Sequence, residues 1–242
     1  MDQEVDILGV KIDKLSKLEV LAEIEKLLAQ AGSNLVVTAN SEMIINAYHQ
    51  QSFREIINQA ELTLADGIGL IWAARILGSR LPERIAGVDL FKELLKLAAK
   101  KKQRVYLLGA KPEVVAKTEA VIKAELPTIK LKSHHGYLTQ DLRQKVIAEI
   151  NNYQTDILFV AMGSPLQEKW LAKNLAKLDI TLAMGVGGSF DIIAGVKKRA
   201  PIILQRLGLE WFYRLLQEPK RISRVVAIPE FIIRVLLAKT SR

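Results

Sequence analysis

The chain has 242 residues, of which 50% are hydrophobic and 25% charged, so it is long enough for one large domain and its composition argues against extended disorder. The absence of cysteine excludes disulfides, thiolate catalysis and cysteine-based zinc sites. The formal net charge of +9 lies almost wholly in residues 196–242, which contain eleven Lys and Arg but only three Glu. Acidic residues near the N-terminus, and apolar runs shorter than the roughly 18 residues of a membrane span, favour a cytoplasmic protein.

Apolar runs typical of strands alternate with helical patterns up to residue 188. A capping-box pattern of Ser16 and Glu19 begins the first predicted helix. The continuous apolar runs predict an α/β fold with a Rossmann-like, mostly parallel sheet and helices on both faces. Strands are predicted at 5–12, 34–40, 62–65, 104–110, 128–136, 156–163 and 180–188, and helices at 18–30, 41–60, 67–77, 111–126, 140–152 and 164–178.

The basic C-terminal segment is unusually apolar. We expect an α/β domain over 1–195 and a helical appendage over 196–242, broken by Pro219 and Pro229. Its arginines recur among aliphatic and aromatic side chains, a pattern typical of a segment that lies on an anionic membrane. An ordinary helical subdomain remains an alternative, whereas nucleic-acid binding is disfavoured because no known motif presents the charges on a polar face. Apolar surface of this kind also predicts homo-oligomers.

Small and polar residues end the predicted strands. In open parallel sheets ligands bind beyond the carboxyl ends of the strands, so these residues are the candidate site. The chain has neither a P-loop nor a complete dinucleotide fingerprint, but two glycine turns lead into helices whose N-termini can bind phosphate. The candidates from this argument are Thr38, Asn40, Asp66, Gly109, Gly163, Ser164, Gly185, Gly187 and Gly188.

Asp66 is the candidate reactive group. A carboxylate that follows a buried strand is partly desolvated, which makes it a better proton acceptor. The alternative is that Asp66 caps the following helix. No metal is expected, because His134 and His135 are adjacent and a strand would point them to opposite faces.

The ordered motifs of the chain resemble those of the WecG/TagA/CpsF glycosyltransferase family. The resemblance covers residues 5–225 and rests on TANSEM, ADGIGL, RIAGVDL, LLGAKPEV, HHGYL, VAMGSPLQEKW, GVGGSFDIIAG and KRAP followed by GLEWFYRLLQEPKR. Among family members the chain is most similar to those of wall teichoic acid synthesis. The resemblance implies inverting, metal-independent transfer of N-acetylmannosamine from its UDP sugar to the C4 hydroxyl of GlcNAc on undecaprenyl diphosphate. No cofactor is implied.

The resemblance also implies roles for single residues. Asp66 matches the family's proposed general base, and Thr38, Asn40, Arg84 and Gln167 match substrate-binding positions. Further cations for the diphosphates, or for bilayer phosphates, are expected from the appendage, with Arg214, Arg221 and Arg224 as candidates. The expected place of action is the inner face of the cell membrane, where the protein would bind peripherally. Two alternatives remain, a different UDP sugar as donor and a nucleotide-binding module without turnover.

Overall fold

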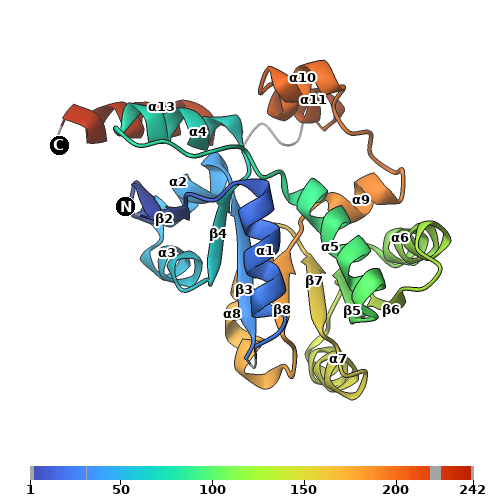
Figure 1. Ribbon diagram of the computed structural model, residues 1–242. Coiled ribbons are helices and arrows are strands. Elements are labelled where there is room, and N and C mark those ends of the chain that lie inside the picture. The colour runs from blue at the N-terminus through green and yellow to red at the C-terminus, as the bar shows by residue number, and fades with distance from the viewer. Residues whose placement is uncertain (1–2, 31, 219–224, 241–242) are drawn as a thin grey trace. The chain divides into compact units, whose positions relative to one another are not determined.

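A computed structural model of the chain describes residues 3–30, 32–218 and 225–240 (Figure 1). The chain divides into two compact units, one made of 1–18, 38–86 and 198–242 and the other of 19–37 and 87–197. The boundary expected at residue 195 stays a prediction. By its contacts the C-terminal segment belongs to the same unit as residues 38–86.

The main sheet has six strands in the order β4-β3-β8-β7-β5-β6, and helices flank it (Figure 1). The register is parallel between β3 and β8, β8 and β7, β7 and β5, and β5 and β6. This confirms the predicted α/β class. The strands are β3 (Asn34–Ala39), β4 (Leu62–Ala65), β5 (Arg104–Gly109), β6 (Lys130–His134), β7 (Ile157–Ala161) and β8 (Leu182–Gly185).

The core of the second unit lies around β5, β7 and β8. Every residue of β7 and β8 is buried, as expected for continuous apolar strands covered on both faces. Phe159 of β7 packs against Phe91 with ring centroids 4.6 Å apart, and Phe91 lies 5.7 Å from Phe190. The helices of this unit are α1 (Lys17–Leu27, which begins in the first unit), α5 (Gly87–Lys101), α6 (Pro112–Glu125), α7 (Gln140–Asn152), α8 (Leu166–Asn174), η1 (Leu175–Lys177) and α9 (Ser189–Ile193). Helix α5 is not among the helices predicted from the sequence.

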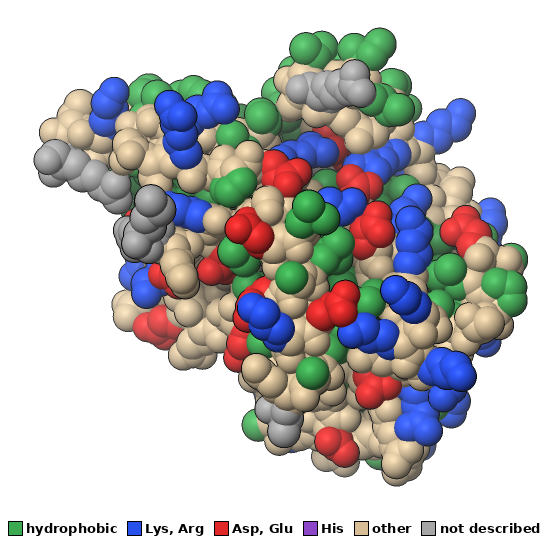
Figure 2. Space-filling view, in the orientation of Figure 1, with side chains coloured by type: hydrophobic (Ala, Val, Ile, Leu, Met, Phe, Trp, Pro, Cys, Tyr) green, Lys and Arg blue, Asp and Glu red, His purple; other side chains and the backbone are tan. Residues whose placement is uncertain are grey.

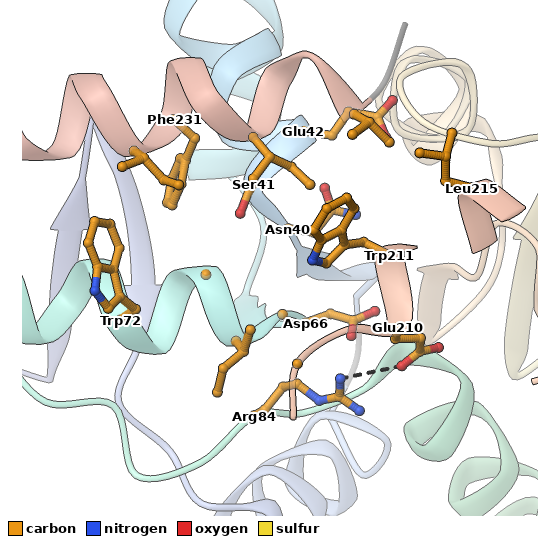
Figure 3. Close-up of a pocket in the computed structure, with 17 residues that line it drawn as sticks. Asn40, Ser41, Glu42, Asp66, Trp72, Arg84, Glu210, Trp211, Leu215 and Phe231 are labelled. Carbon is orange, nitrogen blue, oxygen red and sulfur yellow. Dashed lines mark hydrogen bonds and ion pairs between the residues drawn. The ribbon is translucent and has the colours of Figure 1, made fainter. Parts of the chain in front are cut away.

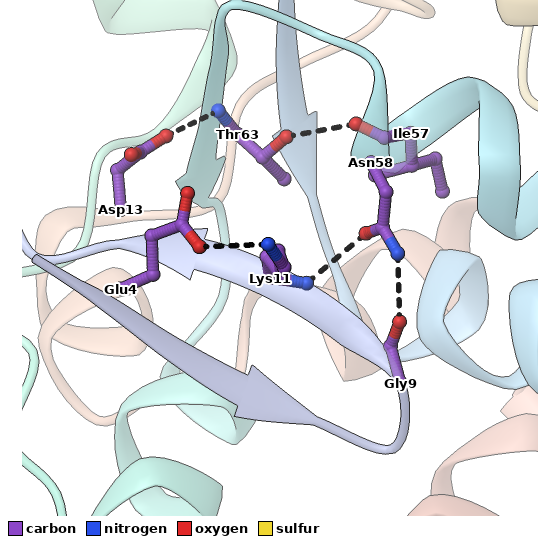
Figure 4. A network of polar contacts seen from close by, with 7 residues as sticks. All are labelled: Glu4, Gly9, Lys11, Asp13, Ile57, Asn58 and Thr63. Atoms are coloured by element: carbon purple, nitrogen blue, oxygen red, sulfur yellow. Dashed lines mark hydrogen bonds and ion pairs between the residues drawn. The ribbon is translucent and has the colours of Figure 1, made fainter. Parts of the chain in front are cut away.

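Residues 4–13 of the first unit form a hairpin, so the prediction of one strand over 5–12 is wrong. Strands β1 (Glu4–Ile7) and β2 (Val10–Asp13) pair antiparallel. The turn between them places Leu8 and Gly9 in the left-handed region, at φ of 55° and 87°. Asn58 stabilises the turn, because its side chain donates to the Gly9 carbonyl at 2.9 Å and accepts from the Lys11 amide at 3.1 Å (Figure 4). Asp13 accepts from the amide of Thr63 at 2.7 Å and so joins the hairpin to β4.

The single helix predicted over 41–60 is also wrong, because the structure has two helices there. Helix α2 (Ser41–His49) and helix α3 (Gln51–Asn58) meet at Gln50, whose backbone is extended with φ −124° and ψ 99°. Residues 48–52 are all exposed, so no contact with the core holds this stretch in one continuous helix. Helix α4 (Ile68–Ile76) follows β4.

Where the structure describes it, the C-terminal segment forms helices, as predicted. Helices α10 (Ile202–Arg206), α11 (Glu210–Gln217) and α13 (Ala227–Thr240) belong to the first unit, and α13 packs against α2 and α4. The break predicted at Pro229 falls just before it, because α13 begins at Ala227 and Pro229 lies in its first turn, where the missing N–H is not needed. Pro219 lies outside the described residues. Over the part of the chain that the structure describes, no helix is both long and apolar enough to cross a membrane.

Candidate active site

A pocket of about 550 Å³ lies within the first unit (Figure 3). Its volume is in the range of sites that bind small molecules. We call one group of lining residues the polar half, namely Asn40, Ser41, Glu42, Asp66, Arg84 and Glu210. We call a second group the apolar half, namely Ile68, Trp72, Ile228, Phe231 and Ile232. Trp211, Leu215 and Val225 also line the pocket, with Gly67, Gly69 and Gly208.

Two strand ends bring Asn40 and Asp66 together. Asp66 directly follows β4, and its amide donates to the carbonyl of Ala39, the last residue of β3, at 2.7 Å. Asn40 follows Ala39 and caps α2, because its side chain accepts from the Met43 amide at 3.0 Å. Gly67, and not Asp66, occupies the N-cap position of α4. This placement leaves the carboxylate of Asp66 in the pocket wall (Figure 3).

Arg84 reaches the same strand ends from a later loop. The amide of Ile85 donates to the carbonyl of Ala65 at 2.8 Å, which fixes the loop beside the end of β4. The guanidinium of Arg84 forms an ion pair with Glu210 of α11 at 3.3 Å, and these side chains are only 20% and 12% exposed. Figure 3 shows this pair toward one end of the pocket and Trp72 toward the other.

The described side chains give the polar half an excess of negative charge. It contains the three acids Glu42, Asp66 and Glu210 but one base, Arg84, whose charge is shared with Glu210. Carboxylates suit hydrogen bonding to sugar hydroxyls and proton transfer. A diphosphate, in contrast, needs cations beyond Arg84.

The remaining candidates of the first unit lie elsewhere or outside the described part. Thr38 is a half-buried residue of β3 and does not line the pocket. Arg214 belongs to α11, but its side chain is not among those described. Arg221 and Arg224 lie outside the described residues.

In the second unit, Gln167 binds two of the candidate glycine loops. Its side chain is buried, and its Oε1 accepts from the amides of Gly163 at 3.1 Å and Gly187 at 3.0 Å. Its Nε2 donates to Glu168 Oε1 at 2.7 Å. Two of the amides expected to bind phosphate therefore already have an acceptor within the protein.

Packing accounts for two further glycines of the second unit. Gly109 has φ of 137°, and a Cβ there would collide with the backbone of Ala161 on the neighbouring strand. A Cβ at Gly185 would lie 2.5 Å from Nε2 of Gln167. Ser164 precedes Pro165, the N-cap of α8, and Gly188 is the N-cap of α9. The second unit thus contains the nucleotide-binding candidates, while the pocket belongs to the first.

The structure adds pocket residues that the sequence did not indicate. Glu42, Trp72, Glu210 and Phe231 all line it. Trp72 could have been found, because it follows Ile68 at helical spacing. Glu210 could not, because it is 126 residues from its partner Arg84 in sequence. Among the described residues, no group of three or more His, Asp or Glu could hold a metal ion. Metal independence stays a prediction.

A parallel α/β sheet whose strand ends carry polar residues into a pocket is typical of enzymes that act on nucleotides and their sugars. The comparison with known proteins makes this class specific. The chain belongs to the glycosyl transferase WecG/TagA/CpsF family, whose model matches residues 5–242. The resemblance read from the motifs is therefore confirmed.

Named relatives of the chain are found in Staphylococcus aureus. Proteins of strains MW2 and NCTC 8325 are each 40% identical to it over 239 residues, which is 98% of this chain and 93% of theirs. The protein of strain MRSA252 is 39% identical over the same share. All three are named N-acetylglucosaminyldiphosphoundecaprenol N-acetyl-beta-D-mannosaminyltransferase.

Proposed function

We propose that this protein transfers N-acetylmannosamine from UDP-N-acetylmannosamine to the C4 hydroxyl of GlcNAc on undecaprenyl diphosphate, with inversion at the anomeric carbon. This would be the first committed step in building the linkage unit of wall teichoic acid. The observation that carries the proposal is 40% identity over 98% of the chain to relatives with the corresponding name. The pocket that contains Asp66 supports it.

Asp66 is the proposed general base. The acceptor hydroxyl oxygen attacks the anomeric carbon on the face opposite UDP, and the bond from that carbon to UDP breaks as the new one forms. UDP leaves with the bonding electron pair, and the hydroxyl proton moves to the carboxylate of Asp66. Asn40, held beside Asp66 by the joined strand ends, would orient the acceptor sugar.

Charge on the diphosphates has to be balanced by cations that the polar half does not supply. Its three acids outnumber Arg84, which already pairs with Glu210. We therefore assign the missing cations to the appendage, with Arg214, Arg221 and Arg224 as the candidates. Thr38 and Gln167 keep proposed roles in positioning, Gln167 through the loops that it joins.

We further propose that the protein binds peripherally to an anionic membrane surface. Residues 196–242 have eleven basic residues against three acidic ones. Hydrophobic side chains gather on the surface over α10 and α11 (Figure 2), including exposed Ile202, Ile203, Leu207 and Leu216. Basic charge beside exposed apolar side chains is the combination that binds such surfaces.

The test is a transfer assay with purified protein, UDP-N-acetylmannosamine and a soluble lipid-diphosphate GlcNAc analogue. The rate of UDP release is measured. We expect UDP release that requires the acceptor, and a disaccharide product with the β linkage. UDP-glucose, UDP-galactose and UDP-N-acetylmannosaminuronic acid, offered separately, should react far more slowly. Faster transfer from one of them would identify that UDP sugar as the donor. UDP binding without transfer to any acceptor would refute the proposal.

The same assay tests the role of metal. Activity should survive excess EDTA if arginines and backbone amides balance the charge of the leaving UDP. Loss of activity in EDTA that magnesium or manganese restores would contradict this account.

A further inference from the structure

The apolar half of the pocket is built from one face of each of two helices. Ile68 and Trp72 lie four residues apart on α4, and Ile228, Phe231 and Ile232 have the corresponding spacing on α13. Trp72 is 37% exposed and Ile232 39%, although both lie in a concave site. Large apolar side chains that remain open to solvent in a pocket indicate an apolar ligand.

The position of the apolar half relative to Asp66 matches an amphiphilic substrate. Trp72 lies about 6 Å along the axis of α4 from Ile68, since a helix rises about 1.5 Å per residue. Ile68 is two residues from Asp66 in sequence. In the proposed acceptor, the sugar ring and two phosphates separate the reacting hydroxyl from the first isoprene unit. With the hydroxyl at Asp66, the chain would therefore leave the polar half before it meets apolar side chains.

We infer that the apolar half binds the isoprenoid chain of the acceptor next to its diphosphate, an inference that rests on the proposed function. The sugar and the diphosphate would occupy the polar half and its added cations. The first isoprene units would pack between Trp72 of α4 and Ile232 of α13. The pocket then selects acceptors by their chain as well as by their sugar, even without a membrane.

Neighbouring residues of α13 provide a matched pair of variants. Ile232 lines the pocket, whereas Ile233 does not line it and is 57% exposed. Ile232→Asn and Ile233→Asn make the same chemical change one residue apart on the same helix. Both positions are more than one-third exposed, so both variants should fold, which thermal unfolding would verify.

A binding experiment tests the inference without turnover. Farnesyl diphosphate and inorganic diphosphate are titrated separately into the full-length protein while tryptophan fluorescence is followed, because Trp72 and Trp211 both line the pocket. Burial of apolar surface should make farnesyl diphosphate bind at least about tenfold more tightly than inorganic diphosphate. Ile232→Asn should remove most of that difference, and Ile233→Asn should retain it.

A transfer experiment gives a second readout. It is done without bilayers and with each acceptor below the concentration at which it forms micelles. GlcNAc-diphosphate acceptors with one and with three isoprene units are compared by kcat/KM, and the ratio should favour the longer chain by about tenfold or more. Trp72→Gln and Ile232→Asn should bring this ratio close to one, while Ile233→Asn should keep the ratio of the unmodified protein.

The two readouts separate the inference from the proposed function. Transfer that occurs with a ratio near one in the unmodified protein would overturn the inference and leave the function standing. Farnesyl diphosphate binding that depends on Ile232, with no transfer to any acceptor, would refute the function but support an isoprenoid site. An equal loss in Ile232→Asn and Ile233→Asn would also overturn the inference, because it would indicate a general surface effect.

Discussion

Asp66 owes its position to the hydrogen bond between its own amide and Ala39, which joins the ends of β4 and β3. We predict that Asp66→Asn lowers turnover by about two to four powers of ten, because the amide keeps the shape of the side chain but cannot accept the proton. Initial rates of UDP release measure this loss, and thermal unfolding should be unchanged. Glu42→Gln is the matched control, since it removes the same charge from the same pocket. Equal losses in both variants would mean that charge, and not proton transfer, matters.

A second prediction concerns the contribution of the ion pair between Arg84 and Glu210 to stability. Both side chains are mostly buried, so we expect a coupling free energy of roughly 1 kcal/mol in a double-mutant cycle of Arg84→Ala and Glu210→Ala. Denaturant unfolding measures it. The pair of Lys11 and Glu4 is the control, because these side chains are 60% and 45% exposed and water screens their charges. A coupling for Arg84 and Glu210 no larger than the control would contradict the prediction.

Sequence patterns predicted the residues of the polar half unevenly. Asp66 and Asn40 could be placed together because both follow apolar strands, and parallel strands end at one edge. Arg84 entered only through the family resemblance. Glu210 could not be found, because an ion pair across 126 residues leaves no local pattern. Gln167 was predicted as a substrate-binding residue. Its hydrogen bonds to the amides of Gly163 and Gly187 could not be predicted, because they depend on how two loops meet.

At the scale of helices, Gly208 allows the turn between α10 and α11 to pack closely against α4. Its φ is 73°, and a Cβ would collide with the side chain of Ile68. We predict that Gly208→Ala destabilises the protein by more than about 1 kcal/mol, through backbone strain and collision together. Thermal unfolding and the rate of proteolysis within 201–218 measure the effect. Gly78→Ala is the control for strain alone, because Gly78 has φ of 82° and nothing lies within 4 Å of its Cβ position. Equal effects of the two substitutions would rule out the collision.

Buried strands were the most predictable elements, because continuous apolar runs report burial directly. The 15-residue helix α5 was missed, although its buried residues recur at helical spacing. The two wrong predictions, at 5–12 and 41–60, share a cause. A turn with Leu8 in the left-handed region and a break at Gln50 both interrupt patterns that look continuous in the sequence. At the turn, contacts of Asn58 with Gly9 and Lys11 stabilise the interruption. At Gln50 the surrounding residues 48–52 are all exposed.

Removal of residues 196–242 would affect the whole protein in several ways. It takes away eleven basic and three acidic residues, and it uncovers α2 and α4 because Phe231 and Val235 of α13 are buried. We predict that the truncated protein no longer binds anionic liposomes and has lost turnover even of a short, soluble acceptor. Liposome sedimentation and UDP release measure these two losses. Circular dichroism should still show the α/β fold of 19–37 and 87–197.

The truncation has outcomes that would contradict the proposals. Liposome binding equal to that of the full chain would show that the membrane-binding surface lies elsewhere. Full turnover of a soluble acceptor would show that neither the appendage arginines nor the lining residues of α11 and α13 take part in the reaction.

The first unit is assembled from three separated stretches of chain, and this fixes the order in which a new molecule can be completed on the ribosome. All of 19–37 and 87–197 is made before residue 198, so the second unit can fold while synthesis continues. The pocket, in contrast, needs Glu210, Phe231 and Ile232, which are made after the whole of the second unit. Until then the apolar faces of α2 and α4 lack their cover and are available to chaperones and proteases. A nascent chain therefore cannot complete this pocket until residues 210–232 have been made.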